Sequence, residues 1–219
     1  MTSKYTARSR EPSAKELADS IKLDGNSTIV VLKPHVLQDE AKAEAVIAHI
    51  ASICEDRGYS YSLVSIEISR GMAEMHFLGR GKEFIERAGR KVADALGPAG
   101  IDSGTVAQAT SYELGRTVLE VHAREAEGKG ALMFIIRGEG ALGLFAQIKG
   151  STDPSNAKPG TIRAMFRDEG ENIARAIAEG RGIHNVVHMP DNIEELSHDV
   201  KTFFMEEAKI KAYKGLLRS

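Results

Sequence analysis

The sequence predicts an α+β domain in which helices pack on a four-stranded antiparallel sheet. Apolar or alternating runs of strand length occur at 28–32, 59–69, 131–136 and 185–188. Between them, apolar residues recur at helical spacing at about 38–57, 71–78, 81–96, 105–127 and 140–149. This order, with extra helices grouped ahead of the third strand, is typical of a ferredoxin-like α/β sandwich.

The chain divides into an extension, one domain and a tail. Residues 1–27 are polar, and Ser13 with Glu16 forms a capping box ahead of apolar residues, which predicts one short helix there. The domain is expected over 28–211 and the tail over 212–219. At 219 residues with 42% hydrophobic content, the chain can bury one full core.

Composition excludes several classes of protein. The 29 basic and 31 acidic side chains give a formal net charge of -2, which does not favour binding to nucleic acid or to an anionic membrane. No apolar run approaches the length of a membrane span. Cys54 is the only cysteine, which excludes an internal disulfide and a cysteine-rich metal site and is compatible with a reducing compartment. We therefore expect a cytoplasmic location.

A phosphate-binding loop is predicted at 152–163. The segment reads Thr-Asp-Pro-Ser-Asn-Ala-Lys-Pro-Gly-Thr-Ile-Arg. Backbone N–H groups, the hydroxyl of Thr152 and the guanidinium of Arg163 are groups that bind an anion with geometric selectivity.

A histidine ends the fourth predicted strand and precedes a helix start. His188 follows two valines, and Asp191 with Glu194 forms a capping box that begins a last helix, expected over 191 to about 211. Free N–H groups at a helix N-terminus favour a nearby phosphate, and imidazole is nucleophilic while it is neutral near pH 7. His188 is therefore a candidate to carry a phosphoryl group covalently.

Together with Lys33-Pro34, these segments form a pattern in which the chain resembles nucleoside diphosphate kinases. The family's pattern is Lys-Pro after the first strand, a loop ending Pro-Gly-Thr-Ile-Arg, and Asn-x-x-His before a helix; here these are Lys33-Pro34, 159–163 and Asn185 to His188. The resemblance covers about 27–97 and 130–207. It implies a ferredoxin-like fold and transfer of the terminal phosphate of a nucleoside triphosphate to a nucleoside diphosphate. Transfer would be ping-pong, through phospho-His188.

The resemblance also implies a cofactor and partners. Mg²⁺ would bridge the nucleotide phosphates and be held mainly by phosphate oxygens and water, with no metal site on the protein itself. ATP and other nucleoside tri- and diphosphates would be the ligands, and the protein would be a homo-oligomer.

Catalytic roles carry over to three residues by the same resemblance. His188 would be the nucleophile and Lys33 would stabilise charge on the transferred phosphate. Asp199 falls where the family has a glutamate that orients the histidine. Because aspartate is shorter, we expect a longer or water-bridged contact.

Four more positions match nucleotide contacts. Thr152 and Arg163 would bind phosphates, and Asn185 would face the ribose. Phe84 would stack on the base, although a core phenylalanine is an equally good interpretation. Counting back from Phe84 puts His76 where the family has a tyrosine near the histidine, whereas a one-residue gap would put Phe77 there; neither supplies a tyrosine hydroxyl.

The sequence also departs from the family at Met189-Pro190, where a small Gly-Ser usually follows the histidine, at Ala146 and in its length. Ala146 occupies the position of a second phosphate-binding arginine, and insertions are expected near 98–129 and 166–182. The second insertion either covers the nucleotide or decorates the surface. It is also a possible source of a replacement cation, from Arg167, Arg175 or Arg181.

Other functions are weaker alternatives. A nucleotide-binding sensor with little or no kinase activity is the second hypothesis, motivated by Ala146. The glycine-rich run 138–143 is placed like a dinucleotide-binding turn, but no second run of parallel βαβ units follows. His184 and His188 have the spacing of helical zinc ligands but flank a strand-forming Val-Val. A nucleic-acid-binding module is disfavoured by the charge balance and by strands poor in aromatic residues.

Overall fold

The computed structural model describes residues 13–97, 109–204 and 210–212. Its sheet has the strand order β4-β1-β3-β2-β5, and every adjacent pair is antiparallel. The predicted four-stranded antiparallel sheet is confirmed, with a short fifth strand added beside β2. The strands are β1 (Ser27–Leu32), β2 (Ser60–Glu67), β3 (Gly130–Arg137), β4 (Val187–His188) and β5 (Ile210–Ala212).

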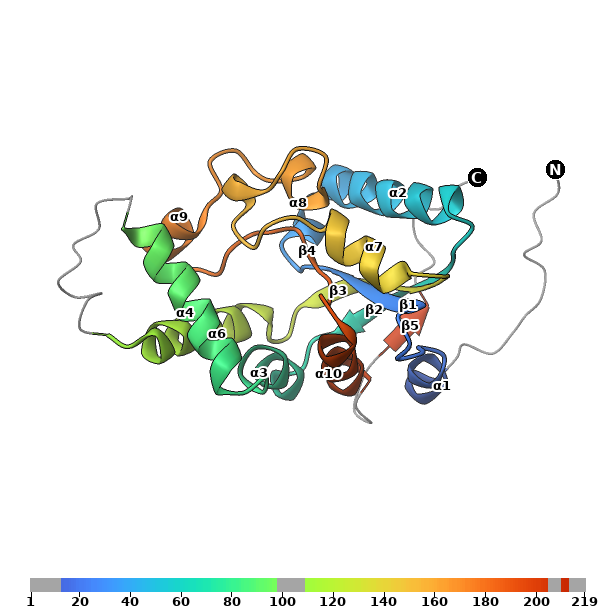
Figure 1. The fold of residues 1–219 in the computed structure, drawn as a ribbon, viewed down its shortest axis with the longest axis horizontal. Coiled ribbons are helices and arrows are strands. Elements are labelled where there is room, and N and C mark those ends of the chain that lie inside the picture. The colour runs from blue at the N-terminus through green and yellow to red at the C-terminus, as the bar shows by residue number, and fades with distance from the viewer. Residues whose placement is uncertain (1–12, 98–108, 205–209, 213–219) are drawn as a thin grey trace.

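One helix precedes the first strand, and the others lie in the connections between strands (Figure 1). The helices are α1 (Ala14–Asp19), α2 (Glu40–Asp56), α3 (Arg70–Leu78), α4 (Lys82–Leu96), α6 (Ser111–Ala126), α7 (Ala141–Ile148), α8 (Ile162–Met165), α9 (Ile173–Ala178) and α10 (Ile193–Phe203), with 3-10 turns η1 (Val36–Gln38) and η2 (Pro154–Asn156). The capping box of Ser13 and Glu16 starts α1 as predicted. The first part of the helix expected over 105–127 falls outside the described residues, and α6 begins after its own cap, Thr110.

The last helix differs from the prediction at both ends. Asn192, rather than Asp191, is its N-cap and accepts a hydrogen bond from the backbone N–H of Glu195. The helix ends at Phe203, and 210–212 form β5 instead of its last turn. Asparagine is as good an N-cap as aspartate, so sequence alone did not choose between adjacent positions.

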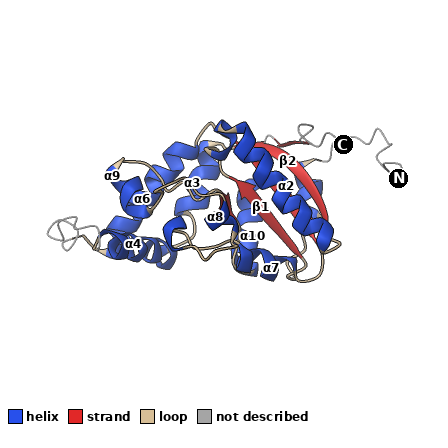
Figure 2. Cartoon of the chain, turned by 90° about the horizontal axis from the view of Figure 1, so that it is seen from above, coloured by secondary structure: helices blue, strands red, loops and turns tan. Residues whose placement is uncertain are grey.

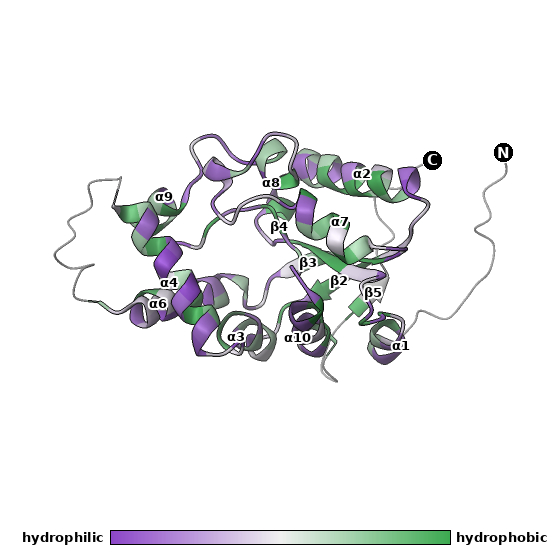
Figure 3. Ribbon diagram, viewed as in Figure 1, coloured by the Kyte–Doolittle hydropathy of each residue, from purple (hydrophilic) through white to green (hydrophobic). Residues whose placement is uncertain are grey.

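Two apolar layers enclose the sheet. Alternate residues of β1 point to opposite faces: Ile29 and Val31 pack with α1, α3 and α10, whereas Val30 and Leu32 pack with α2 and α7. Figures 1 and 2 show these helix groups on the two sides of the sheet. In Figure 3 β1 is strongly hydrophobic, whereas α2 alternates between hydrophobic and hydrophilic residues.

Helices α4, α6 and α9 form a lobe beside the sheet (Figure 1). The two longer helices meet at Gly89 and Gly115, where a Cβ on Gly89 would lie 1.8 Å from the carbonyl oxygen of Ser111 and one on Gly115 would lie 1.9 Å from that of Ile85. Only glycine permits this approach. A separate apolar cluster joins α4 to α9 and the segment after it: Val92, Leu96, Ile173, Ala176 and Ile183.

Candidate active site

A cleft between the end of the sheet and the helical lobe brings together residues predicted from distant segments. Its lining includes all but one of the predicted site residues: Lys33, Phe84, Thr152, Arg163, Asn185 and His188. The exception, Asp199, is fully buried and contacts His188 directly.

A strained turn leads into the histidine. Val186 has φ 59, in the left-handed region that β-branched residues rarely adopt. Its carbonyl accepts a hydrogen bond from the backbone N–H of Lys33 at 3.0 Å, and His188 pairs with Val31 in the sheet. Such strain persists only where the surroundings fix the backbone, and it concentrates at functional sites. The turn places Lys33, Asn185 and His188 at one end of the cleft.

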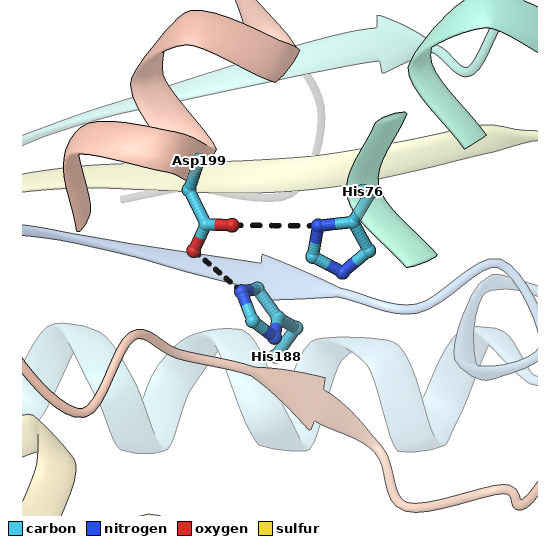
Figure 4. A group of neighbouring side chains, drawn as sticks. All are labelled: His76, His188 and Asp199. Carbon is cyan, nitrogen blue, oxygen red and sulfur yellow. Dashed lines mark hydrogen bonds and ion pairs between the residues drawn. The ribbon is translucent and has the colours of Figure 1, made fainter. Parts of the chain in front are cut away.

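Asp199 connects His188 to α3 (Figure 4). Its Oδ2 lies 2.6 Å from Nε2 of His188 and its Oδ1 lies 3.4 Å from Nδ1 of His76. The expectation of a longer or water-bridged contact to His188 is therefore wrong, because α10 brings the shorter side chain close enough. Arg80 also donates to Asp199, and its guanidinium lies 3.5 Å from Nε2 of His188.

These contacts set the state of the imidazole. Burial lowers the pKa of His188 to about 3, outweighing the carboxylate of Asp199, so the ring is neutral near pH 7. Burial alone would raise the pKa of Asp199, but its interactions with His188 and His76, hydrogen bonds among them, lower it overall. An ionised Asp199 only accepts, so the proton of the neutral imidazole sits on Nε2. Nδ1 keeps its lone pair and has no hydrogen-bond partner among the described residues.

The charged form of Lys33 is disfavoured at the same end of the cleft. Burial first, and then the charge of Arg163, lower the pKa of Lys33 to about 7. Its ammonium makes no hydrogen bond or ion pair with any residue in the described part of the chain. A bound anion would offset the effects of burial and of Arg163, and would raise the pKa of Lys33.

Arg163 lines the cleft, but its guanidinium is hydrogen-bonded to backbone carbonyls. Its guanidinium donates to the carbonyl of Val187 at 2.9 Å and to that of Gly150 at 3.1 Å, and the residue is 5% exposed. The structure therefore shows it joining the predicted phosphate-binding loop to β4. Burial lowers its pKa to about 10, so it remains charged.

Thr152 and Asn185 are coupled across the cleft. The side-chain amide of Asn185 donates to the carbonyl of Thr152 at 2.9 Å, whereas its Oδ1 is buried without a partner. The hydroxyl of Thr152 accepts from the ammonium of Lys91 at 3.1 Å. An unsatisfied buried oxygen is costly, so a donor from a ligand would be favourable there.

Phe84 faces the cleft from the first turn of α4 and is not part of the apolar core. The guanidinium carbons of Arg80 and Arg87 lie 5.0 Å and 5.9 Å from its ring centroid. Both are within the range of cation–π contact.

The arginines of the second insertion do not fill the gap at Ala146. Arg175 pairs with Glu179 at 2.8 Å, and Arg167 donates to the carbonyl of Pro154. Arg181 lines the cleft, but both of its terminal nitrogens bind the carboxylate of Glu171, at 2.8 Å and 2.7 Å. The hypothesis that these side chains supply the missing charge is therefore not supported by the geometry.

Sequence reasoning missed four cations around the cleft: Arg80, Arg87, Lys91 and Lys149. Arg80 lies in the connection between α3 and α4 and reaches Asp199 only through tertiary packing. Lys91 follows Phe84 by seven residues, a helical spacing that places both on one face of α4, and this spacing was an available signal. Lys149 donates to the carbonyl of Met189 and to the carboxylate of Asp191, contacts that no local pattern indicates.

One group in the described part of the chain has the composition of a metal site: His76, His188 and Asp199 (Figure 4). Arg80 pairs with the same carboxylate, so a positive charge already occupies this position. Nitrogen ligands also do not suit Mg²⁺, which prefers oxygen.

Two alternatives from the sequence fail on geometry. His184 stacks on His35 with ring centroids 4.2 Å apart, and it does not belong to the group that contains His188. The run 138–143 follows β3, and every strand pair in the described sheet is antiparallel, so the parallel βαβ setting of a dinucleotide site does not occur there.

None of the described helices is both long and apolar enough to cross a membrane.

Comparisons with known proteins agree with this geometry. Residues 122–209 match the sequence profile of the family "Nucleoside diphosphate kinase". A nucleoside diphosphate kinase from Pyrobaculum aerophilum is 26% identical over 183 residues, which cover 82% of this chain and 95% of that protein. One from Thermomicrobium roseum is 25% identical over 193 residues, covering 87% and 95%. The crystal structure of an NDP kinase from P. aerophilum superposes with a TM-score of 0.69 at 25% identity, covering 83% of this chain and 97% of that one.

Proposed function

Because the chain belongs to the nucleoside diphosphate kinase family, we propose that it transfers the terminal phosphate of a nucleoside triphosphate to a nucleoside diphosphate through phospho-His188. The observation that carries this proposal is the state of the imidazole. Asp199 holds Nε2 at 2.6 Å, and Nδ1 is left without a partner on a residue that lines the cleft. A neutral, oriented imidazole beside unpaired cations is suited to attack a phosphoryl group.

In the first half-reaction, Nδ1 of His188 attacks the terminal phosphorus. The N–P bond forms as the bond from phosphorus to the bridging oxygen breaks, and the diphosphate leaves with that electron pair. The phosphorylated ring keeps its proton on Nε2, where Asp199 stabilises the positive charge that develops. In the second half-reaction, the terminal oxygen of another diphosphate attacks the phosphorus and restores the neutral imidazole.

The cations of the cleft bind and stabilise the phosphates. Lys33 lies at the end of the cleft that contains His188, so it serves the transferred group. Protonation of Lys33 on binding would increase that stabilisation, because its pKa in the free protein is about 7. Thr152 and Asn185, joined by the hydrogen bond from the amide of Asn185 to the carbonyl of Thr152, serve the rest of the phosphate chain and the ribose.

Mg²⁺ would enter with the nucleotide. The cleft carboxylates are engaged, because Asp191 binds Lys149 and Glu195 accepts from the backbone N–H of Asp191 at 3.1 Å. Phosphate oxygens and water would therefore supply most of the ligands, and the ion would neutralise charge on the phosphates.

A nucleotide-binding sensor with little kinase activity is the second proposal. It is favoured by one observation: Arg163 is committed to backbone carbonyls and Ala146 supplies no guanidinium. Homo-oligomer formation and a cytoplasmic location rest on the resemblance and on composition, and both stay predictions.

A coupled assay with Mg²⁺-ATP and a second nucleoside diphosphate separates the two functions. Phosphotransfer with parallel double-reciprocal plots is expected for the ping-pong enzyme. Binding of both nucleotides without turnover would favour the sensor.

A further inference from the structure

The family binds phosphate with arginines at two positions, and neither position supplies a free guanidinium in this chain. Ala146 has no guanidinium, and the N–H groups of Arg163 are directed at the carbonyls of Val187 and Gly150. A nucleotide phosphate beside Thr152 therefore requires another cation.

Lys91 is the cation that the structure places at this point. It extends from α4 across the cleft, and its ammonium donates to the hydroxyl of Thr152 at 3.1 Å. No carboxylate in the described part of the chain forms an ion pair with it. Lys149, the other lysine nearby, differs because it is paired with Asp191 and bound to the carbonyl of Met189.

We propose that Lys91 binds a phosphate of the nucleotide in place of the arginine that is absent at Ala146. The inference rests on the proposed function, since it assigns a contact within the same site. Thr152 would share that phosphate, because its hydroxyl can donate to a phosphate oxygen once the ammonium turns to the same anion.

The surroundings of Lys91 favour an anion. Partial burial and the charges of Arg163 and Arg87 lower the pKa of Lys91. These positive groups repel one another across the free cleft, and a phosphate between them would replace repulsion by attraction.

The two insertions hold the helix that carries Lys91. Gly89 of α4 and Gly115 of α6 allow the first insertion to contact α4 at backbone distance. From the second insertion, Ile173 packs in the same apolar cluster as Val92, the residue next to Lys91. The insertions thus compensate for Ala146 by positioning a lysine on α4, without contributing the charge themselves.

The test compares binding of ADP and of adenosine by titration calorimetry. Lys91→Met removes the charge and keeps the stem, Lys91→Arg keeps the charge, and Arg90→Met is the matched control because Arg90 is exposed on the same helix and does not line the cleft. We expect Lys91→Met to raise the dissociation constant of ADP about tenfold, equivalent to about 1.4 kcal/mol. Adenosine, which lacks phosphate, should bind unchanged, and Lys91→Arg and Arg90→Met should bind ADP nearly as the unsubstituted protein does.

Each other outcome has a distinct meaning. Unchanged ADP affinity in Lys91→Met, or an equal loss for ADP and adenosine, would overturn the assignment, because the side chain would then be either irrelevant or merely structural. If the unsubstituted protein binds no ADP, the proposed function itself fails.

Discussion

Nε2 of His188 lies 2.6 Å from Oδ2 of Asp199, and the carboxylate is fully buried. This contact fixes which ring nitrogen carries the proton and leaves the other with a free lone pair. It also explains how an aspartate serves where the family pattern has the longer glutamate: α10 presents residue 199 close enough for a direct hydrogen bond.

Asp199→Asn should lower kcat by about a hundredfold or more, while the affinity for ADP changes little. An asparagine amide can donate to Nε2, which would move the ring proton to Nδ1 and remove the nucleophile. Steady-state kinetics measure the effect, and Asp199→Glu, which keeps the carboxylate, should retain much of the rate. Full activity in Asp199→Asn would show that the contact does not orient the nucleophile.

Nucleotide binding should take up a proton at pH 8. With a pKa of about 7, Lys33 is mostly neutral at pH 8 in the free protein, and a bound phosphate raises that pKa. Uptake should therefore approach one proton at pH 8 and vanish near pH 6, where Lys33 is already charged. Calorimetry of ADP binding in two buffers of different ionisation enthalpy measures the uptake. If Lys33→Met takes up as much as the unsubstituted protein, another group is responsible.

His35→Phe should make the protein less sensitive to acid. Burial lowers the pKa of His35 to about 2, against an ordinary value of 6.5, so below pH 6.5 the unfolded chain binds a proton that the folded chain does not. Stability present above pH 6.5 is thus lost as the pH falls, at up to about 1.4 kcal/mol per unit. Denaturant melts at pH 7 and pH 5 should show a loss about 2 kcal/mol smaller in the variant. Equal losses would mean that His35 is protonated in the folded protein.

The arginines of the second insertion should affect folding and not nucleotide affinity. Arg181→Ala leaves the buried carboxylate of Glu171, 3% exposed, with the backbone N–H of His184 but without its ion-pair partner, and should cost about 3–5 kcal/mol of stability. Arg175→Ala removes an exposed pair with Glu179 and an exposed hydrogen bond to the carbonyl of Glu169, and should cost less than about 1 kcal/mol. Thermal melts and ADP titrations measure both effects. A tenfold loss of ADP affinity in folded Arg175→Ala would restore the idea that this insertion supplies charge.

The fold was predictable because its periodicities are strong. The core strands have apolar runs that match their burial, and helices such as α4 and α10 have clear apolar stripes. Element ends were less predictable: Asp191 and Asn192 are equally good caps, and β5 is too short to have a pattern of its own.

The candidate site was predictable where residues lie in contiguous motifs, as Asn185 and His188 do. It was not predictable where a role depends on tertiary packing. The approach of α6 to α4 positions Lys91, and the α3–α4 connection brings Arg80 onto Asp199. Arg163 shows the opposite case, because a motif residue with an expected ligand contact is bound to backbone carbonyls. The contacts of Lys91, Arg80 and Arg163 depend on distances between segments that are far apart in the chain, and a single sequence does not contain these distances.

Labelling with Mg²⁺-[γ-³²P]ATP shows whether His188 carries the phosphoryl group. The label should be incorporated rapidly, be stable to alkali and labile to acid, be discharged by a nucleoside diphosphate, and be absent from a folded His188→Gln variant that still binds ADP. Label that survives acid treatment, or that persists in His188→Gln, would contradict that role.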